Sequence, residues 1–232
     1  MSDTLPQIEA GMRRQLRSFH QALASGMPRL GWKIGINDPA AQQRLGLPSP
    51  IVGWLDGRRL IPVGEPYSPP EGAKPRVEAE TAILLGADVP AHASLDAARE
   101  AIASVAPAIE FVNGAKPLAP LEELLAHDIL HDAVMIGSGK PLEAASGLVA
   151  AGLPAVSLDG QPHRVGLPGR YPDDLAEIVV LVAGTLARYG ESLNAGDWII
   201  AGSYIDPFDI APGSSVSADF GPLGRIDFSV AP

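Results

Sequence analysis

The chain has 232 residues, 46% of them hydrophobic and 19% charged, which is enough apolar material for one large domain or one domain with a small appendage. Its net charge of −10 argues against nucleic acid or an anionic membrane as a partner. An anionic small substrate stays compatible, because a bound cation can reverse the local field. The lack of cysteine excludes disulfides, thiolate zinc sites and cysteine nucleophiles. Because no signal-like N-terminus and no long apolar run occurs, we expect a soluble, cytoplasmic protein.

Hydrophobic periodicity, turn residues and capping residues predict the secondary structure in chain order. We expect a helix at 7–25, a strand at 30–36, a small helix at 39–45, short strands and turns over 47–75, a strand at 76–86, a helix at about 95–104, a strand at 105–112, a helical turn at 120–126, a strand at 133–137, β-structure from 145 with a hairpin turn at 159–160, a helix at 173–189, and strands at 198–201, 214–220 and 225–230.

Strands outnumber helices in this pattern, and most of the connections between them are short. The sequence therefore predicts an α+β fold around a curled, mixed β-sheet, with a short N-terminal helix and peripheral helices. No glycine-rich phosphate-binding motif follows a strand, so nucleotide binding has no support.

Two glutamates one residue apart, Glu78 and Glu80, lie in an otherwise apolar run. Residues i and i+2 of a strand point to the same face, so a strand here would aim both carboxylates at one spot. Glu110 lies in a second apolar run and would join them if the two strands are neighbours. Buried carboxylates are unfavourable without a cation, and Mg²⁺ takes oxygen ligands, so a metal site is one interpretation. The alternative is that the glutamates lie on the solvent face of an edge strand.

Lys33 lies between Gly31 and Gly35, which would let a ligand approach the backbone closely. Its ammonium group offers a cation for a carboxylate or enolate oxygen, although an ordinary surface lysine is the alternative. Arg76 directly precedes the glutamates and is a candidate partner for one of them or for substrate.

His127 and His131 are four residues apart, which on a helix would place both on one face for substrate binding or proton transfer. Ser203 follows a predicted strand and offers a hydroxyl group to a ligand, with an ordinary turn as the alternative. No G-x-S-x-G elbow is present, so serine-hydrolase chemistry lacks its main signature.

Six segments, in this order, resemble the fumarylacetoacetate hydrolase superfamily, and within it the branch of 2-oxopent-4-enoate hydratases and 2-oxo-3-hexenedioate decarboxylases. They are Gly-Trp-Lys-Ile-Gly-Ile at 31–36, and the stretches at 42–47, 75–80, 106–112, 189–203 and 216–224. The resemblance implies a curled β-rich catalytic domain over 30–232, behind a short helical segment at 1–29. It also implies Mg²⁺ or Mn²⁺ held by Glu78, Glu80 and Glu110, a 2-oxo acid that chelates this ion, and Lys33 as a catalytic residue.

The resemblance further implies a homo-oligomer of at least two subunits. The N-terminal helix agrees with this expectation, because Met12, Leu16 and Phe19 form an apolar face that needs a surface to cover it.

The chain departs from the branch pattern at several positions. An aspartate usually lies five residues after the glycine that Gly53 matches, but Arg58 stands there and Asp56 lies two positions earlier. Asp56 is therefore a candidate catalytic residue, and Arg58 a candidate substrate-binding cation. His127-Asp128 replaces a usual Asp-Asn pair, residues 170–172 read Arg-Tyr-Pro where Gly-His-Pro is usual, and the N-terminal region is shorter than in the branch.

These features favour a metal-dependent lyase that adds water to a short 2-hydroxydienoate or 2-oxo acid. Three alternatives stay open. One is decarboxylation of a 2-oxo dicarboxylic acid, with Arg58 binding the second carboxylate. Another is C–C hydrolysis of an acylpyruvate, with His127 or His131 activating water. The third is a non-catalytic binding protein that keeps the fold.

Overall fold

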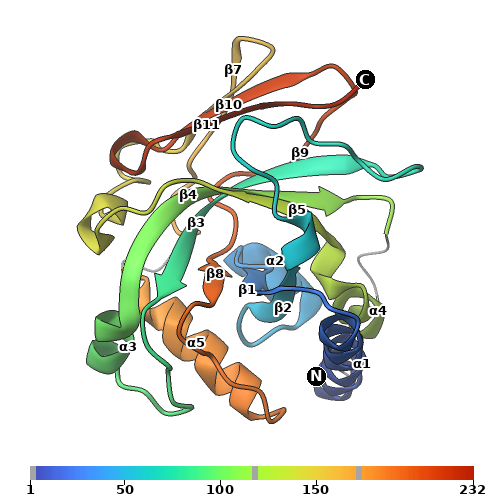
Figure 1. Cartoon of the computed structure of the whole chain (residues 1–232), viewed down its shortest axis with the longest axis vertical. Helices are drawn as coiled ribbons and strands as arrows, with labels where there is room; N and C mark the ends of the chain where they lie inside the picture. The colour runs from blue at the N-terminus through green and yellow to red at the C-terminus, as the bar shows by residue number, and fades with distance from the viewer. Residues whose placement is uncertain (1–3, 117–119, 171–173) are drawn as a thin grey trace.

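Within residues 4–116, 120–170 and 174–232, which the computed structural model describes, the chain forms two β-sheets flanked by helices (Figure 1). The α-helices are α1 (Thr4–Ala24), α2 (Pro39–Leu45), α3 (Leu95–Ala101), α4 (Leu121–Ala126) and α5 (Ala176–Ala187). The strands are β1 (Arg29–Gly35), β2 (Ile51–Asp56), β3 (Pro75–Leu85), β4 (Ile102–Asn113), β5 (His131–Ile136), β6 (Ala155–Leu158), β7 (Gln161–Val165), β8 (Trp198–Ile200), β9 (Phe208–Asp209), β10 (Ser215–Asp219) and β11 (Arg225–Ser229). Four 3₁₀ turns join them, namely η1 (Gly57–Arg59), η2 (Asp128–Leu130), η3 (Leu142–Ala145) and η4 (Gly221–Leu223).

The larger sheet is mixed and strongly curled. Its strand order is β2-β1-β8-β3-β4-β5, β9 also pairs with β3, and only the β1–β8 pair is parallel among the described strands. The two ends of this order meet, because Leu60 beyond β2 bridges to Val134 of β5 and the N–H of Ile61 donates to the Val134 carbonyl at 2.9 Å. The prediction of an α+β fold around a curled mixed sheet is confirmed.

The smaller sheet has the order β11-β10-β6-β7 and lies over β3 and β4 (Figure 1). Aromatic side chains fill the space between the two sheets. Phe111 of β4 stacks on Tyr67 with ring centroids 3.9 Å apart and contacts Phe228 of β11 edge-on at 5.0 Å. The two layers therefore share one apolar core.

Helix α1 packs on this core along its apolar face. Met12, Leu16 and Phe19 are all buried, and the Phe19 ring lies 5.0 Å from Trp32 and 5.6 Å from Trp54. The face is therefore covered by the chain itself, so it gives no reason of its own to expect a second subunit. The helix also packs on α4, where Arg14 forms ion pairs with Glu122 and Glu123.

The boundaries of two helices differ from the predictions. Helix α3 ends at Ala101 instead of 104, because Ile102 and Ser104 are extended and pair with Leu85 and Leu84 of β3. The predicted helix at 173–189 begins at Ala176 in the structure, and Asp173 lies outside the described residues. No described helix has the length and apolar character needed to cross a membrane.

Candidate metal and substrate site

The three glutamates meet on one face of the β3–β4 pair. Glu78 lies directly opposite Glu110 in the antiparallel register, and Glu80 is two residues further along β3. One ligand atom from each carboxylate lies within 4.8 Å of the other two. Because β3 is an interior strand between β8 and β4, the alternative of a solvent-exposed edge strand is excluded.

The oxygen atoms of this cluster suit a hard cation. Glu80 and Glu110 are completely buried, and Oε2 of Glu80 accepts a hydrogen bond of 2.7 Å from the N–H of Gly202. Glu80 Oε1 and Glu110 Oε2 are buried and accept no hydrogen bond from the described residues. Buried carboxylate oxygens without donors are unfavourable, and a divalent cation with oxygen ligands removes that penalty. The donor set therefore fits Mg²⁺ or Mn²⁺.

Lys33 of β1 is the buried counter-ion of Glu110. Its Nζ forms a short ion pair with Glu110 Oε1 and donates to the Ile129 carbonyl at 3.3 Å. The lysine is 1% exposed, so it is not an ordinary surface lysine.

The glycines on either side of Lys33 serve packing within the protein. Gly31 has φ +142°, and a Cβ there would meet the Trp198 carbonyl oxygen at 1.9 Å. A Cβ at Gly35 would meet Cγ2 of Ile129 at 2.6 Å. Both glycines let β1 approach its neighbours closely, and protein atoms fill the space beside them.

The electrostatics of the cluster follow from burial and from charge spacing. Burial, with the neighbouring Glu110 charge, raises the pKa of Glu78 to about 7. Burial and the charges of Glu110 and Glu78 raise the pKa of Glu80 well above its usual value. Burial also acts to raise the pKa of Glu110, but Lys33 and His131 outweigh it and hold the pKa below the usual value. Glu110 is thus the carboxylate that stays ionised beside Lys33.

His131 connects this cluster to a cavity of about 520 Å³. Its Nδ1 lies 2.8 Å from Glu110 Oε1, while its buried Nε2 contacts no hydrogen-bonding partner in the described part of the chain. The cavity is lined by Trp54, Asp56, Arg59, Pro70, Lys116, Ala126, His127, Asp128, His131 and Asp132. His131 begins β5 whereas His127 is the C-cap residue that follows α4, so the two histidines do not share one helix face.

Asp56 lines this cavity and forms an ion pair with Arg58. The Arg58 side chain donates to Asp56 Oδ1 at 2.9 Å and to Oδ2 at 2.7 Å. Burial acts to raise the pKa of Asp56, but the hydrogen bonds from Arg58 outweigh it and hold the pKa below its usual value. Arg59 donates to Oδ2 of Asp132 at 2.8 Å and to the Asp132 backbone carbonyl at 2.9 Å.

The other two predicted residues make structural contacts near the cluster. Arg76 pairs with Asp209 at 3.1 Å and donates to the Pro207 carbonyl at 2.8 Å, so no ion pair to a glutamate is formed. The Ser203 hydroxyl donates to the Ile205 carbonyl at 2.9 Å within a local turn. Ser203 directly follows Gly202, whose N–H binds Glu80.

Two residues near Glu78 and Ser203, Arg170 and Asn37, were not predicted from the sequence as site residues. Arg170 forms an ion pair with Asp206, and its charge acts to lower the pKa of Glu78. Asn37 donates to the carbonyl oxygens of Arg170 and Ser203, at 2.9 Å each, and so ties the two loops together. The departure from Gly-His-Pro at 170–172 was the available signal for Arg170, but Tyr171 and Pro172 lie outside the described residues.

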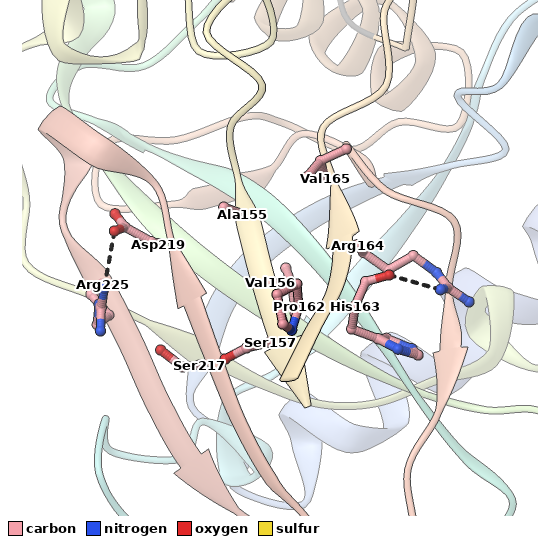
Figure 2. A pocket seen from close by; sticks show the side chains of 10 residues that line it. All are labelled: Ala155, Val156, Ser157, Pro162, His163, Arg164, Val165, Ser217, Asp219 and Arg225. Carbon is pink, nitrogen blue, oxygen red and sulfur yellow. Dashed lines mark hydrogen bonds and ion pairs between the residues drawn. The ribbon is translucent and has the colours of Figure 1, made fainter. Parts of the chain in front are cut away.

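A separate hollow of about 460 Å³ lies on the smaller sheet (Figure 2). Residues of β6, β7, β10 and β11 line it, and none of the three glutamates does. Arg225 there is paired with Asp219 at 3.0 Å, and Arg164 donates to the His163 carbonyl. This hollow is therefore not part of the carboxylate site.

Comparison with known proteins finds hydratases and decarboxylases that are similar to this chain along most of its length. The chain is 26% identical over 230 residues to a 4-oxalocrotonate decarboxylase of Pseudomonas sp., and the match covers 98% of this chain and 88% of the relative. It is 24% identical over 234 residues to a 2-keto-4-pentenoate hydratase of Paraburkholderia xenovorans, covering 97% and 86%. The chain is a homologue of these decarboxylases and hydratases. No protein-family model matches it.

The fold of this hydratase and decarboxylase homologue is that of the fumarylacetoacetate hydrolase family, as the sequence resemblance implied. The structure of 4-oxalocrotonate decarboxylase from Pseudomonas putida G7, solved with magnesium and adipate, superposes with a TM-score of 0.83. Its sequence is 22% identical, and the match covers 93% of this chain and 83% of the decarboxylase. The cluster of Glu78, Glu80 and Glu110 can bind a metal, and structural neighbours are complexed with Mg²⁺, Mn²⁺ or Ca²⁺.

Proposed function

We propose that the chain is a divalent-metal-dependent hydratase (a lyase) that adds water to a short 2-hydroxydienoate or 2-oxo acid, as in the meta-cleavage degradation of aromatic compounds. The observation that carries this proposal is the buried cluster of Glu78, Glu80 and Glu110 with Lys33 and His131 on the same carboxylate. The hydratases among the homologues support the choice of reaction.

The roles of the side chains follow from their contacts. Glu78, Glu80 and Glu110 would hold the cation, which when bound supplies a Lewis acid that polarises the 2-oxo group. Lys33 keeps Glu110 ionised and offers a positive charge to negative charge that develops on the substrate. His131 would exchange a proton with a ligand through Nε2, which has no hydrogen-bonding partner among the described residues.

Asp56, Arg58, Arg76 and Ser203 keep more limited proposed roles. Asp56 lines the cavity and is a candidate for proton transfer, while Arg58 is the candidate cation for a substrate carboxylate. Each now binds the other, so either must leave that pair to contact substrate. Arg76 and Ser203 border the site and would act on substrate only by exchanging their present partners.

Decarboxylation of a 2-oxo dicarboxylic acid is the second candidate. A 4-oxalocrotonate decarboxylase is among the similar sequences, and the similar decarboxylase structure holds adipate, a dicarboxylate. This reaction needs a cation for the second carboxylate. Arg59, which lines the cavity, is paired with Asp132, and Arg58 is paired with Asp56, which favours the hydratase.

Turnover assays separate these reactions. The protein is mixed with 2-hydroxypenta-2,4-dienoate, 2-oxo-3-hexenedioate or acetylpyruvate, each with Mg²⁺, with Mn²⁺ or with EDTA. We expect metal-dependent hydration of the first, and loss of activity in Glu80→Gln and Glu110→Gln but not in the exposed control Glu100→Gln. Preferred turnover of the second or third compound would identify a decarboxylase or a C–C hydrolase. No turnover of any compound would favour a non-catalytic binding protein.

We also propose a homo-oligomer of at least two subunits, cytoplasmic, in which residues 30–232 form the catalytic domain behind the helical segment at 1–29. The oligomer rests on the family resemblance. Light scattering that reports a particle of 24.1 kDa at micromolar concentration would contradict it, and fractionation of cells that make the protein would test the location.

A further inference from the structure

Asp128 lies in the cavity in a backbone conformation that few residues adopt. It has φ +53°, and Ile129 and Leu130 follow with φ +50° and +67°. Three consecutive non-glycine residues in the left-handed region are strained, and such strain persists only where surrounding contacts hold it. The turn η2 therefore carries its aspartate into the cavity at an energetic cost.

One oxygen of Asp128 is held firmly and the other is not. Oδ1 accepts a hydrogen bond of 2.7 Å from Nε2 of Gln15 and one of 2.9 Å from the N–H of Trp54. Oδ2 accepts no hydrogen bond from residues 4–116, 120–170 or 174–232. Since Asp128 lines the cavity, this second oxygen is the one available to a ligand.

The fit between Asp128, Lys33 and Gly53 is close. Gly53 of β2 lies opposite Lys33 of β1, and a Cβ at Gly53 would meet Asp128 Oδ1 at 2.8 Å, Lys33 Cγ at 3.0 Å and Gln15 Nε2 at 3.2 Å. The carboxylate and the amide thus occupy the space that any larger residue would fill. Gln15 comes from α1 and is 1% exposed, so an element at the start of the chain completes this corner of the site.

We propose that Asp128 is a catalytic acid–base residue of the reaction in this cavity, and that Gln15 is the residue that positions it. This inference rests on the proposed hydratase function. During hydration the Asp128 carboxylate would take one proton from the attacking water, as the water oxygen forms its bond to the double-bonded carbon. The electron pair of that double bond moves to the adjacent carbon, which then receives the proton back from Asp128. One molecule of water is added, and Asp128 ends as it began.

The surroundings of Asp128 suit proton exchange near neutral pH. Burial raises its pKa to about 6, although the charges of His131 and Lys33 and the hydrogen bonds from Trp54 and Gln15 act to lower it. A carboxyl group with a pKa close to the working pH both gives and takes a proton readily. The charged or titratable groups that share its cavity are Asp56, Arg59, Lys116, His127, His131 and Asp132. From α1 the neutral Gln15 faces it.

The test compares Asp128→Asn with wild-type protein on 2-hydroxypenta-2,4-dienoate and Mg²⁺. Asparagine tolerates the left-handed conformation, and its Oδ1 can still accept both hydrogen bonds. We therefore expect an unchanged melting temperature, unchanged Mg²⁺ affinity, a KM within about threefold, and a kcat lower by about 10²-fold or more. The acidic limb of the pH profile of kcat/KM should disappear.

Gln15→Leu tests the positioning role. Loss of this donor removes a contact that lowers the pKa of Asp128, so the acidic limb should move to higher pH, with kcat reduced by about tenfold. The matched control is Gln21→Leu, which changes an exposed residue of the same helix and should leave the profile unchanged. If the wild-type enzyme is active and the Asp128→Asn variant keeps its kcat and its acidic limb, the inference about Asp128 is wrong while the proposed function stands. Wild-type protein without turnover of any of the three 2-oxo or dienoic acids would instead overturn the proposed function, and the role of Asp128 with it.

Discussion

Lys33→Met removes the ammonium group that pairs with Glu110 and keeps a side chain of similar length. The variant leaves the Glu110 carboxylate buried without its cation, while Glu78 and Glu80 stay in place. Breaking a buried ion pair from one side destabilises a protein by about 3–5 kcal/mol. For a chain of this length, that corresponds to a melting temperature lower by roughly 10 °C in the absence of metal.

Metal binding should change in the opposite direction from metal-free stability. Lys33 competes with a metal ion for Glu110 Oε1. Two unit charges 4 Å apart attract each other by about 4 kcal/mol at an effective dielectric constant near 20, which sets the order of magnitude of this competition. Part of that energy becomes available to a divalent cation once the ammonium is gone. We expect Mg²⁺ to bind about tenfold more tightly by calorimetry, and saturating Mg²⁺ to restore much of the lost stability.

Activity should nevertheless fall. Without Lys33, negative charge that develops on the substrate loses its nearby cation, so kcat/KM should drop by about 10²-fold or more. The exposed residue Lys140 provides the control Lys140→Met, which should change none of the three quantities. Near wild-type turnover in Lys33→Met would refute a catalytic role for the lysine. Unchanged Mg²⁺ affinity and unchanged stability would refute the charge coupling to Glu110.

Two further results are expected. Because the pKa of Glu78 is raised from 4.5 to about 7, metal-free protein should lose about 3 kcal/mol of stability as pH rises through that range. Mg²⁺ affinity should rise over the same range, because the ligand must lose its proton, and a pH-independent Mg²⁺ affinity measured by calorimetry would contradict this. Gly53→Ala should destabilise by about 1–3 kcal/mol and lower kcat, because its methyl group would meet Asp128 and Lys33. In its control, Gly184→Ala in α5, the added Cβ would make only an ordinary contact of 3.7 Å with the Ala91 carbonyl oxygen, so we expect stabilisation by about 0.5–1 kcal/mol in denaturant unfolding. Equal effects of the two alanines would count against the close packing at Gly53.

Local patterns were sufficient to predict the elements and the shared face of Glu78 and Glu80. In any β-strand the side chains of residues i and i+2 point to the same face, whatever the rest of the fold is. The sequence predicted that Glu110 joins the other two glutamates only if the two strands are neighbours. Helix α3 separates β3 from β4 in the chain, and the register that places Glu78 opposite Glu110 is set by the whole strand pair. Family resemblance supplied what the local pattern lacked.

The contact between Lys33 and Glu110 could not be read from the sequence. It requires β1 to run parallel to β8 and β8 to pair with β3, and the strand order of a mixed sheet is a tertiary property. For the same reason, the sequence pattern alone also allowed Lys33 to be a surface lysine. Its burial follows from the packing of Gly31 and Gly35 against Trp198 and Ile129.

Asp128 was hidden for a different reason. The turn at 128–130 adopts left-handed conformations that residues such as Ile129 and Leu130 disfavour, so propensity gave no signal for it. One signal was present in α1, where Gln15 stands among Met12, Leu16 and Phe19 on the apolar face. A polar residue on a buried helix face must find a partner inside the protein, and here that partner is Asp128.

The charge balance of the cluster links fold and function. Three carboxylates and the Lys33 ammonium leave two formal negative charges inside the curled sheet. Burying these charges so close together is unfavourable, and burial with the charges of Glu110 and Glu78 raises the pKa of Glu80 well above its usual value. One divalent cation cancels the two charges and lets Glu78 and Glu80 ionise together. We therefore expect the arrangement to bind a dication more tightly than a monovalent ion. Lys33 stops the cluster from carrying a third uncompensated charge, and its ammonium group lies beside the place where substrate charge would develop.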